Sequence, residues 1–521
     1  MAQRTSLQRD LPTARRVALA LATTVAVAFC ALLVARLAID YSTRSLITHF
    51  SGDAAIWVNV HEFLNRGHIL YRDVWDHKDA GFFVLSHPFF ARMGLEGLYV
   101  FGLTFVLMFA AGVFFAVRAI STTLGAAIIA ALATIAYVST PSFYPTNPEH
   151  PSISLAVFGA GIAASHPAIA GFALLLSCTV KMSGVFIYAC VAGLYVARLL
   201  FYQLSPSVAK RNLTLFALGS IAALLFFVAI SNGTVSWSDW LQVATFNREY
   251  AERRAPPLKV GDFVSLFDRS CPRQILLTLY ALLASLVVLG ALSSPRALRV
   301  RTSKTISPSL FSLACLVGAY IAQMLQYPPS PHHWQYLAGA ITFSAAVCLT
   351  ACVVSLPIKA LRIGIFLICG LYLAQQWRAV LPASFSVGWA DIARASKTRA
   401  ALSTATSLLP ANSTIAIFGG NHERVDIQDS PASLSLVCRF FYQFELFAPR
   451  FSQEIDTCLD RKPRFVFFDT SHTPAVSSAA RSRLQAEYVD CKVVDRNFKI
   501  YAADLESCAS VARVNSSHGL Q

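Results

Sequence analysis

Long apolar runs recur along the first three quarters of the chain and set its predicted architecture. A transmembrane helix needs ~20 predominantly apolar residues, so these runs, several of them shorter, predict about eleven membrane-spanning helices. A shorter apolar segment, residues 81–93, is expected to be re-entrant or to lie along the membrane interface. The predicted spans lie at residues 17–39, 98–120, 122–139, 153–164, 169–180, 185–200, 213–231, 275–292, 310–325, 336–354 and 363–375.

The composition agrees with an α-helical polytopic membrane protein and argues against a large soluble core. Of the 521 residues, 55% are hydrophobic and 14% are charged, and the mean hydropathy is +0.54. The formal net charge of +15 comes from cations scattered over loops, whereas nucleic-acid binding would need them on one face or stripe. We therefore expect the cations to set topology and to meet anionic lipid headgroups or phosphates.

The basic residues predict the orientation of the chain. An arginine-containing lead precedes a first apolar run that is too long for a signal peptide, so we expect this run to be retained with the N-terminus in the cytoplasm. Alternation then puts the basic loops 205–212, 293–304 and 356–362 in the cytoplasm, as short basic loops should be. It puts a first loop, 40–97, and the tail, 381–521, outside the cytoplasm.

The tail, residues 381–521, contains no spanning segment and predicts a small extracytoplasmic α/β domain behind a transmembrane domain of residues 1–380. Apolar runs at 413–420, 464–470 and 491–503 are typical of strands, and amphipathic helical segments separate them. Its cysteines could form disulfides in an oxidising compartment, but the pairing cannot be read from a sequence and free thiols remain an alternative. They are Cys438, Cys458, Cys491 and Cys508.

Asp53 follows Gly52 in the stretch just beyond the first predicted span. Residues 54–67 follow it with helical apolar spacing, which predicts a helix on the membrane surface. The N-terminus of a helix keeps a nearby carboxylate ionised, and an ionised carboxylate can act as general base toward a hydroxyl or amine. A simple N-cap is the alternative role.

A dense charged cluster follows at residues 71–81. Arg72 and Lys78 suit a phosphate, whereas Asp73 and Asp76 suit a metal ion or sugar hydroxyls. The cluster therefore predicts a headgroup site, and the alternative is a solvated loop with internal ion pairs.

More polar residues fall on the same predicted side of the membrane. Glu149 and His150 form part of an Asn-Pro-Glu-His segment, and His332 and His333 precede a late span. These four could bind a divalent ion or contact a sugar or phosphate, but no fixed ligand spacing supports a metal, so the metal remains unknown. Lys181 ends a short apolar segment, where a lysine either snorkels to the interface or pairs with an anion.

Two other classes of protein lack support in the sequence. The first class is nucleotide-using ATPases and dehydrogenases. No segment fits the GxxxxGK[ST] phosphate-binding loop, and residues 418–422 do not fit the GxGxxG dinucleotide-binding motif. The predicted spans hold no chain of acidic and arginine residues of the kind that ion-coupled transporters use.

Together these motifs resemble the GT-C superfamily of integral membrane glycosyltransferases. The similar features are an aspartate opening the first loop, the YRDVWDHK segment, NPEH, a K-x-S-G segment at Lys181 and HHWQYL. The nearest pattern is the bacterial branch similar to protein mannosyltransferases and lipid A aminoarabinose transferases, over about the first 380 residues. Where that family has two prolines after its lysine, Asp79 and Ala80 stand here.

The resemblance implies an inverting hexosyl- or pentosyltransferase in the bacterial inner membrane. Its donor would be a sugar on a polyprenyl phosphate, and its acceptor an extracytoplasmic glycan, lipid or protein. By this resemblance, Asp53 would be the catalytic base and Lys78 would meet the donor phosphate. Arg72, Lys181 and His333 are further candidate phosphate ligands because of their chemistry and their place on the same predicted side of the membrane. A flippase or transporter of lipid-linked sugars, without transferase chemistry, is the alternative, and a non-catalytic assembly protein is a third possibility.

Overall fold

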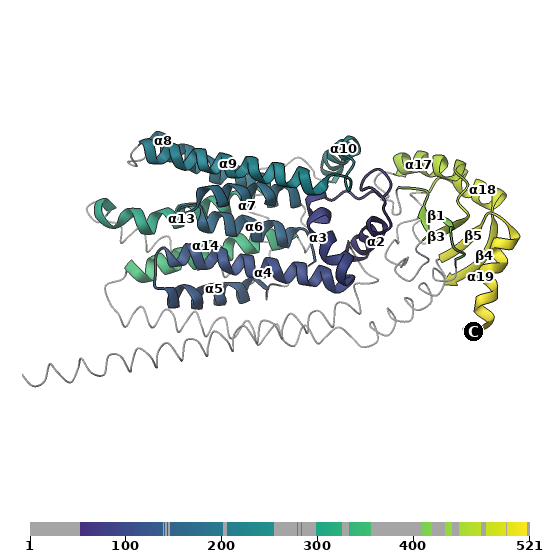
Figure 1. Ribbon diagram of the computed structural model, residues 1–521, viewed down its shortest axis with the longest axis horizontal. Helices are drawn as coiled ribbons and strands as arrows, with labels where there is room; N and C mark the ends of the chain where they lie inside the picture. Colours follow the sequence, from purple (N-terminus) through teal and green to yellow (C-terminus); the bar gives the residue numbers. More distant parts are fainter. Residues whose placement is uncertain are drawn as a thin grey trace, which may run out of the picture. The chain divides into compact units, whose positions relative to one another are not determined.

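The structure is a computed structural model of the chain (Figure 1). It describes residues 53–138, 140, 143, 146–201, 206–254, 279, 283, 298–325, 333–355, 409–418, 433–439, 448–469, 476–495 and 498–517. The predicted helices at 17–39 and 363–375, nearly all of the one at 275–292, and His332 lie outside these described residues.

The described residues belong to two compact units. The first takes its residues from 102–226 and 259–384, and the second takes them from 43–101, 227–258 and 385–521. Helices α4 (Leu95–Arg118) and α9 (Pro206–Ser231) contain boundaries between the units.

The first unit is a bundle of apolar helices (Figure 1). By length and composition, four described helical segments could cross a membrane, at Glu96–Arg118, Pro206–Ser231, Ser307–Met324 and Trp334–Val354. The helices are α4 (Leu95–Arg118), α5 (Thr123–Val138), α6 (Glu149–Ile162), α7 (Pro167–Val180), α8 (Gly184–Phe201), α9 (Pro206–Ser231), α13 (Leu298–Met324) and α14 (Trp334–Ser355). The apolar runs thus predicted a helical membrane protein, which is confirmed.

Two helices begin well before their predicted spans. Helix α9 begins at Pro206 rather than at residue 213, and α13 begins at Leu298 rather than at residue 310. The prediction of loops at 205–212 and 293–304 is therefore wrong over most of the first segment and the second half of the other. Hydropathy detects only the apolar part of a helix, whereas lysine and arginine also favour helix, and proline suits its first turn.

Two glycines let α4 and α6 approach closely within the first unit. A Cβ atom at Gly161 would lie 2.1 Å from the carbonyl oxygen of Gly112. A Cβ atom at Gly112 would lie 2.6 Å from the Cα atom of Phe158. Small residues at such crossings allow the backbone-to-backbone packing on which helix association in membranes depends.

We expect Gly161→Ala to destabilise the protein by about 1–3 kcal/mol, because the added methyl group forces the two backbones apart. Thermal unfolding of the purified chain in detergent would measure the loss. Gly193→Ala in α8 is the matched control, since a Cβ added there has no atom within 4 Å apart from its chain neighbours and the backbone of its own helix. Equal melting temperatures for the two variants would contradict this account of the α4–α6 contact.

The second unit contains a five-stranded sheet of order β2-β1-β3-β5-β4. Strand β1 runs parallel to β2 and β3, whereas β5 runs antiparallel to β3 and β4. Of residues 491–503, expected to form a strand, residues 491–495 lie in β4 and residues 498–502 lie in β5, and these two strands pair antiparallel. The strands are β1 (Thr414–Phe418), β2 (Ser435–Leu436), β3 (Phe465–Asp469), β4 (Val489–Asp495) and β5 (Phe498–Ala502).

Three helices accompany this sheet, and Figure 1 shows them beside it. Ile455 of α17 and Leu484 of α18 form a buried core with Val466 and Phe468 of β3. Because alternate residues of a strand share a face, both helices cover the same face of the sheet. The helices are α17 (Ala448–Asp460), α18 (Ser478–Glu487) and α19 (Leu505–Ser517).

The tail cysteines form two disulfides. Cys438 pairs with Cys458 of α17, and Cys491 of β4 pairs with Cys508 of α19. The cysteines of the first disulfide are 20 residues apart in the sequence, and those of the second are 17 residues apart. The sequence was compatible with either disulfides or free thiols at these four cysteines, and the structure shows disulfides.

Three more helices belong to the second unit: α2 (Asp53–Asn65), α3 (Ala80–Met93) and α10 (Trp237–Arg254). Ile56, Val58 and Val60 of α2 are all at most 4% exposed, although Ile56 and Val58 lie about 200° apart around the helix. The sequence predicted a single buried stripe on a membrane-surface helix, whereas the structure buries α2 on opposite sides. Part of this contact is with α3, where Trp57 meets Phe82 edge to face at 5.1 Å.

Candidate functional site

The loop between α2 and α3 holds most of the predicted charged residues of the second unit. Leu70 forms β-bridges with Val74 and Val235. Tyr71 has a φ of 71°, which is uncommon for a residue other than glycine. It is fully buried, and its hydroxyl donates a hydrogen bond to the carbonyl oxygen of Lys78 at 2.7 Å. These contacts give the charged loop a defined shape.

Asp76 shapes the backbone around Lys78. It is 0% exposed, its Oδ1 accepts a hydrogen bond from the Lys78 N–H at 2.6 Å, and the same oxygen lies 3.6 Å from Nδ1 of His77. Asp79 is the N-cap residue of α3, and Ala80 is the first residue of that helix. The two residues that replace the prolines of the resembled family therefore start a helix directly after Lys78.

Arg72 and Asp73 pair with each other. Nε and Nη2 of Arg72 donate to the two carboxylate oxygens of Asp73, each at 2.9 Å, and Asp73 also accepts from the N–H of Ile69 at 2.8 Å. Burial alone would raise the pKa of Asp73, but the hydrogen bonds from Arg72 and Ile69 outweigh it and lower that pKa. The charge of Arg72 is therefore largely offset before any phosphate is considered.

Asp53, the proposed base, is the first residue of α2. The N–H groups in the first turn of a helix have no partner within the helix, and the helix dipole favours a negative charge there. This position is the one the sequence predicts for an ionised carboxylate.

In the first unit, Glu149, Lys181 and His333 come together from three different elements. Glu149 is the first residue of α6, Lys181 is the C-cap of α7, and His333 directly precedes α14. Lys181 forms an ion pair with Glu149, and Nε2 of His333 lies 3.9 Å from Oε1 of Glu149. The charges of Glu149 and Lys181 are each favoured by the adjoining helix, because anions are stabilised at a helix N-terminus and cations at a C-terminus.

The side chains of this cluster are largely shielded from solvent. The side chain of Glu149 is 0% exposed, and those of Lys181 and His333 are 14% and 13% exposed. Removing charges from water is costly unless they are paired. The ion pair therefore explains how two charged side chains persist among apolar helices.

His150 lies next to Glu149 in the sequence but is held by a different set of partners. Its Nε2 is 2.9 Å from the carbonyl oxygen of Gly102, so this nitrogen carries the proton and donates. Its Nδ1 is then the acceptor, 3.0 Å from the Tyr137 hydroxyl and 3.3 Å from that of Ser154. Both ring nitrogens are thus used within the protein, which favours a structural role for His150.

Sequence reasoning missed a group of buried hydroxyls near this cluster. The Ser152 hydroxyl lies 3.1 Å from that of Ser177 and 3.2 Å from that of Tyr336. The carbonyl oxygen of Ser177 also accepts a hydrogen bond from the backbone N–H of Lys181, at 3.1 Å. Uncharged hydroxyls within apolar helices give little signal, although Ser154 is a polar position within the predicted span 153–164 and Ser152 directly precedes that span.

The chemistry of these side chains does not fit a divalent ion well. Within the described ranges, no group of three or more His, Cys, Asp or Glu side chains could hold a metal. The oxygen of Glu149 that faces His333 is also the one on which the Lys181 ammonium lies. Since hard cations take several oxygen ligands, a site with an ammonium in place of a donor is unsuited to them.

Comparisons with known proteins give a structural match without a sequence match. No protein-family model matches the sequence, and no curated protein is detectably similar to it in sequence. The structure is similar to that of ArnT from Cupriavidus metallidurans bound to undecaprenyl phosphate, with a TM-score of 0.52 and 11% identity. The match covers 93% of this chain and 99% of that one.

Two further solved structures have lower scores. One is ArnT from the same organism in the apo state, with a TM-score of 0.49 and 12% identity; the match covers 94% of this chain and 99% of that one. The other is the Archaeoglobus fulgidus oligosaccharyltransferase tethered with an acceptor peptide. For the latter the TM-score is 0.43 with 11% identity, and the match covers 92% of this chain and 74% of that one. From the match to undecaprenyl-phosphate-bound ArnT we conclude that this chain has the fold of the GT-C membrane glycosyltransferases.

Proposed function

We propose that this protein is an inverting glycosyltransferase that moves a hexose or pentose from a polyprenyl phosphate to an extracytoplasmic glycan, lipid or protein. The observation that carries the proposal is the fold shared with ArnT over nearly the full length of both chains, in a structure bound to undecaprenyl phosphate. The charged cluster buried among the apolar helices of the first unit adds support, because such groups in a membrane bundle usually serve a substrate.

The proposed reaction assigns Asp53 as general base. It takes the proton of an acceptor hydroxyl, whose oxygen attacks the anomeric carbon as the bond from that carbon to the phosphate oxygen breaks. The polyprenyl phosphate leaves with the electron pair, and cations offset its growing charge.

Among the proposed phosphate ligands, the structure favours the lysines and His333 over Arg72. In the first unit, Lys181 and His333 are partly exposed beside Glu149, which would hold the Lys181 ammonium in place. In the second unit, the backbone N–H and carbonyl groups of Lys78 are held by Asp76 and Tyr71. Arg72 already has its bidentate partner in Asp73.

The proposal includes a location and a topology. The protein would lie in the bacterial inner membrane with about eleven spans, its N-terminus in the cytoplasm, and residues 40–97 and 381–521 on the outer side. Two disulfides in the tail agree with an oxidising compartment.

Proteoliposomes containing the purified protein test this function against a flippase. We expect a radiolabelled undecaprenyl-phosphate sugar, mixed with crude cell-envelope acceptor, to give labelled acceptor and free undecaprenyl phosphate. A flippase would move the intact lipid between leaflets without cleaving it. Transport without cleavage, or the same cleavage in protein-free liposomes, would contradict the transferase proposal.

A further inference from the structure

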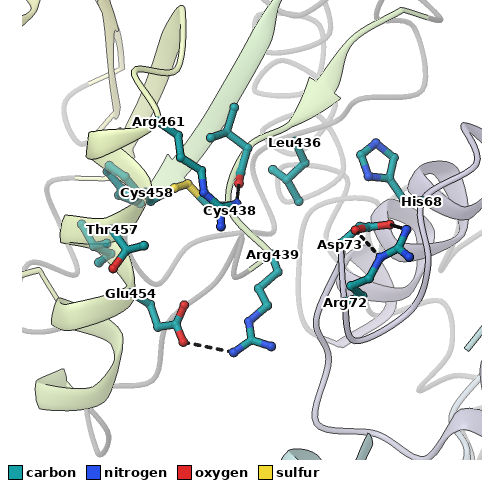
Figure 2. A pocket seen from close by; sticks show the side chains of 13 residues that line it. His68, Arg72, Asp73, Leu436, Cys438, Arg439, Glu454, Thr457, Cys458 and Arg461 are labelled. Atoms are coloured by element: carbon teal, nitrogen blue, oxygen red, sulfur yellow. Dashed lines mark hydrogen bonds and ion pairs between the residues drawn. A yellow bond between two sulfur atoms is a disulfide. The ribbon is translucent and has the colours of Figure 1, made fainter. Parts of the chain in front are cut away.

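The second unit contains a cavity that the proposed reaction does not use (Figure 2). Its volume is about 480 Å³, within the range of ~300–1,000 Å³ typical of small-ligand sites. The loop after α2 contributes His68, Arg72 and Asp73, and the segment after β2 and helix α17 contribute most of the remaining wall.

Two ion pairs stand on separate parts of the wall, as Figure 2 shows. Arg72 pairs with Asp73 at 2.9 Å, and Arg439 pairs with Glu454 at 3.0 Å. Each pair joins N–H donors to carboxylate acceptors, so the wall offers both kinds of hydrogen-bonding group. A sugar hydroxyl both donates and accepts, and a ligand with several hydroxyls would match this wall.

Arg461 adds a cation that these pairs do not balance. Its Nη1 donates to the carbonyl oxygen of Val437 at 3.0 Å, and no ion pair joins it to a carboxylate among the residues that the structure describes. A guanidinium has five N–H donors in a planar fork, so the others remain for a ligand. Burial lowers the pKa of His68, which favours the neutral form of its ring.

A backbone hydrogen bond and a disulfide hold the segments that form the pocket wall around Arg461. The N–H of Val437 donates to the carbonyl oxygen of Ile415 at 2.9 Å, which continues the sheet pairing. The Cys438–Cys458 disulfide joins the same segment to α17. A pocket held in this way can bind a small ligand with little loss of conformational entropy.

We propose that this pocket binds an acidic sugar residue, with the Arg461 fork on its carboxylate or phosphate and the two ion pairs on its hydroxyls. The ligand class is a glycan that carries one negative group in each bound unit. This binding site is additional to the proposed transfer reaction, and it would select acidic glycans.

Isothermal titration calorimetry of the full-length chain in detergent, without any lipid-linked donor, tests the site independently of transferase activity. The probes are trigalacturonate, glucose 6-phosphate and maltotriose, the last being a neutral trisaccharide. We expect at least one acidic probe to bind about tenfold more tightly than maltotriose, as a charge-assisted hydrogen bond would provide. Whichever acidic probe binds identifies the group as carboxylate or phosphate.

Variants assign the binding to Arg461. Arg461→Gln should weaken binding of the acidic probe by about tenfold, and Arg461→Lys should give an intermediate loss because it keeps the charge but not the fork. The matched control Lys462→Gln removes a neighbouring cation that does not line the pocket and should bind as the unaltered protein does. Unchanged melting temperatures would show that the variants are folded.

Three outcomes would overturn the proposal: no binding of either acidic probe, equal binding of maltotriose, or equal losses in Arg461→Gln and Lys462→Gln.

Discussion

Replacing Asp53 with asparagine is expected to reduce sugar transfer by at least about 100-fold, the lower end of what a general base contributes. Asparagine keeps the size of the side chain but cannot take a proton from the acceptor hydroxyl. The rate of undecaprenyl phosphate release in proteoliposomes would measure the effect, with donor binding measured separately. Donor binding should change little, because the proposed role of Asp53 is toward the acceptor.

The matched control is Asp460→Asn at the end of α17. The Asp460 side chain is 68% exposed and pairs with Arg483 in the tail domain, so this change should leave the transfer rate unaltered. Full activity in Asp53→Asn would remove Asp53 from the catalytic role. It would leave the fold assignment intact, because that rests on the structural match.

Replacing Lys181 with methionine is expected to destabilise the protein by about 3 kcal/mol, because a buried carboxylate loses its partner. Glu149 is 0% exposed, so water cannot easily replace the lost ammonium. The double variant Lys181→Met/Glu149→Gln should recover most of the loss, since it removes both charges. Thermal unfolding in detergent would measure all three proteins.

A surface ion pair supplies the control for this comparison. Lys499→Met breaks the pair with Asp490, whose side chains are 34% and 47% exposed, and should cost at most about 1 kcal/mol. The double variant also separates stability from function. If Lys181 meets the donor phosphate, the folded double variant should still be defective in donor binding. The stability account has its own test: a Lys181→Met protein as stable as the Lys499→Met control would contradict it.

Local sequence patterns predicted the elements better than their limits. Apolar runs located the helices of the first unit because lipid-facing and buried positions are both apolar, and apolar runs in the tail located its main strands. The same patterns missed the basic first turns of α9 and α13, where helix propensity rather than hydropathy decides the start. Residues 491–503 have the sequence pattern of a strand, whereas in the structure residues 491–495 lie in β4 and residues 498–502 lie in β5.

The sequence by itself determined that this chain is a helical membrane protein with a short-stranded tail, because both properties follow from local periodicity and composition. It also placed Asp53 after an apolar run, where a helix begins in the structure. Its motifs indicated the GT-C resemblance, which the structural match to ArnT confirms at the level of the fold.

Only the tertiary structure decided which polar residues act together. Glu149 and Lys181 are 32 positions apart, and their pairing depends on how α6 packs on α7. His150 lies about 100° around the helix from Glu149, so neighbours in sequence have different partners. The pocket at Arg461 likewise combines residues from 68–73 with residues from 418–461. Such contacts arise from long-range packing, which local periodicity does not encode.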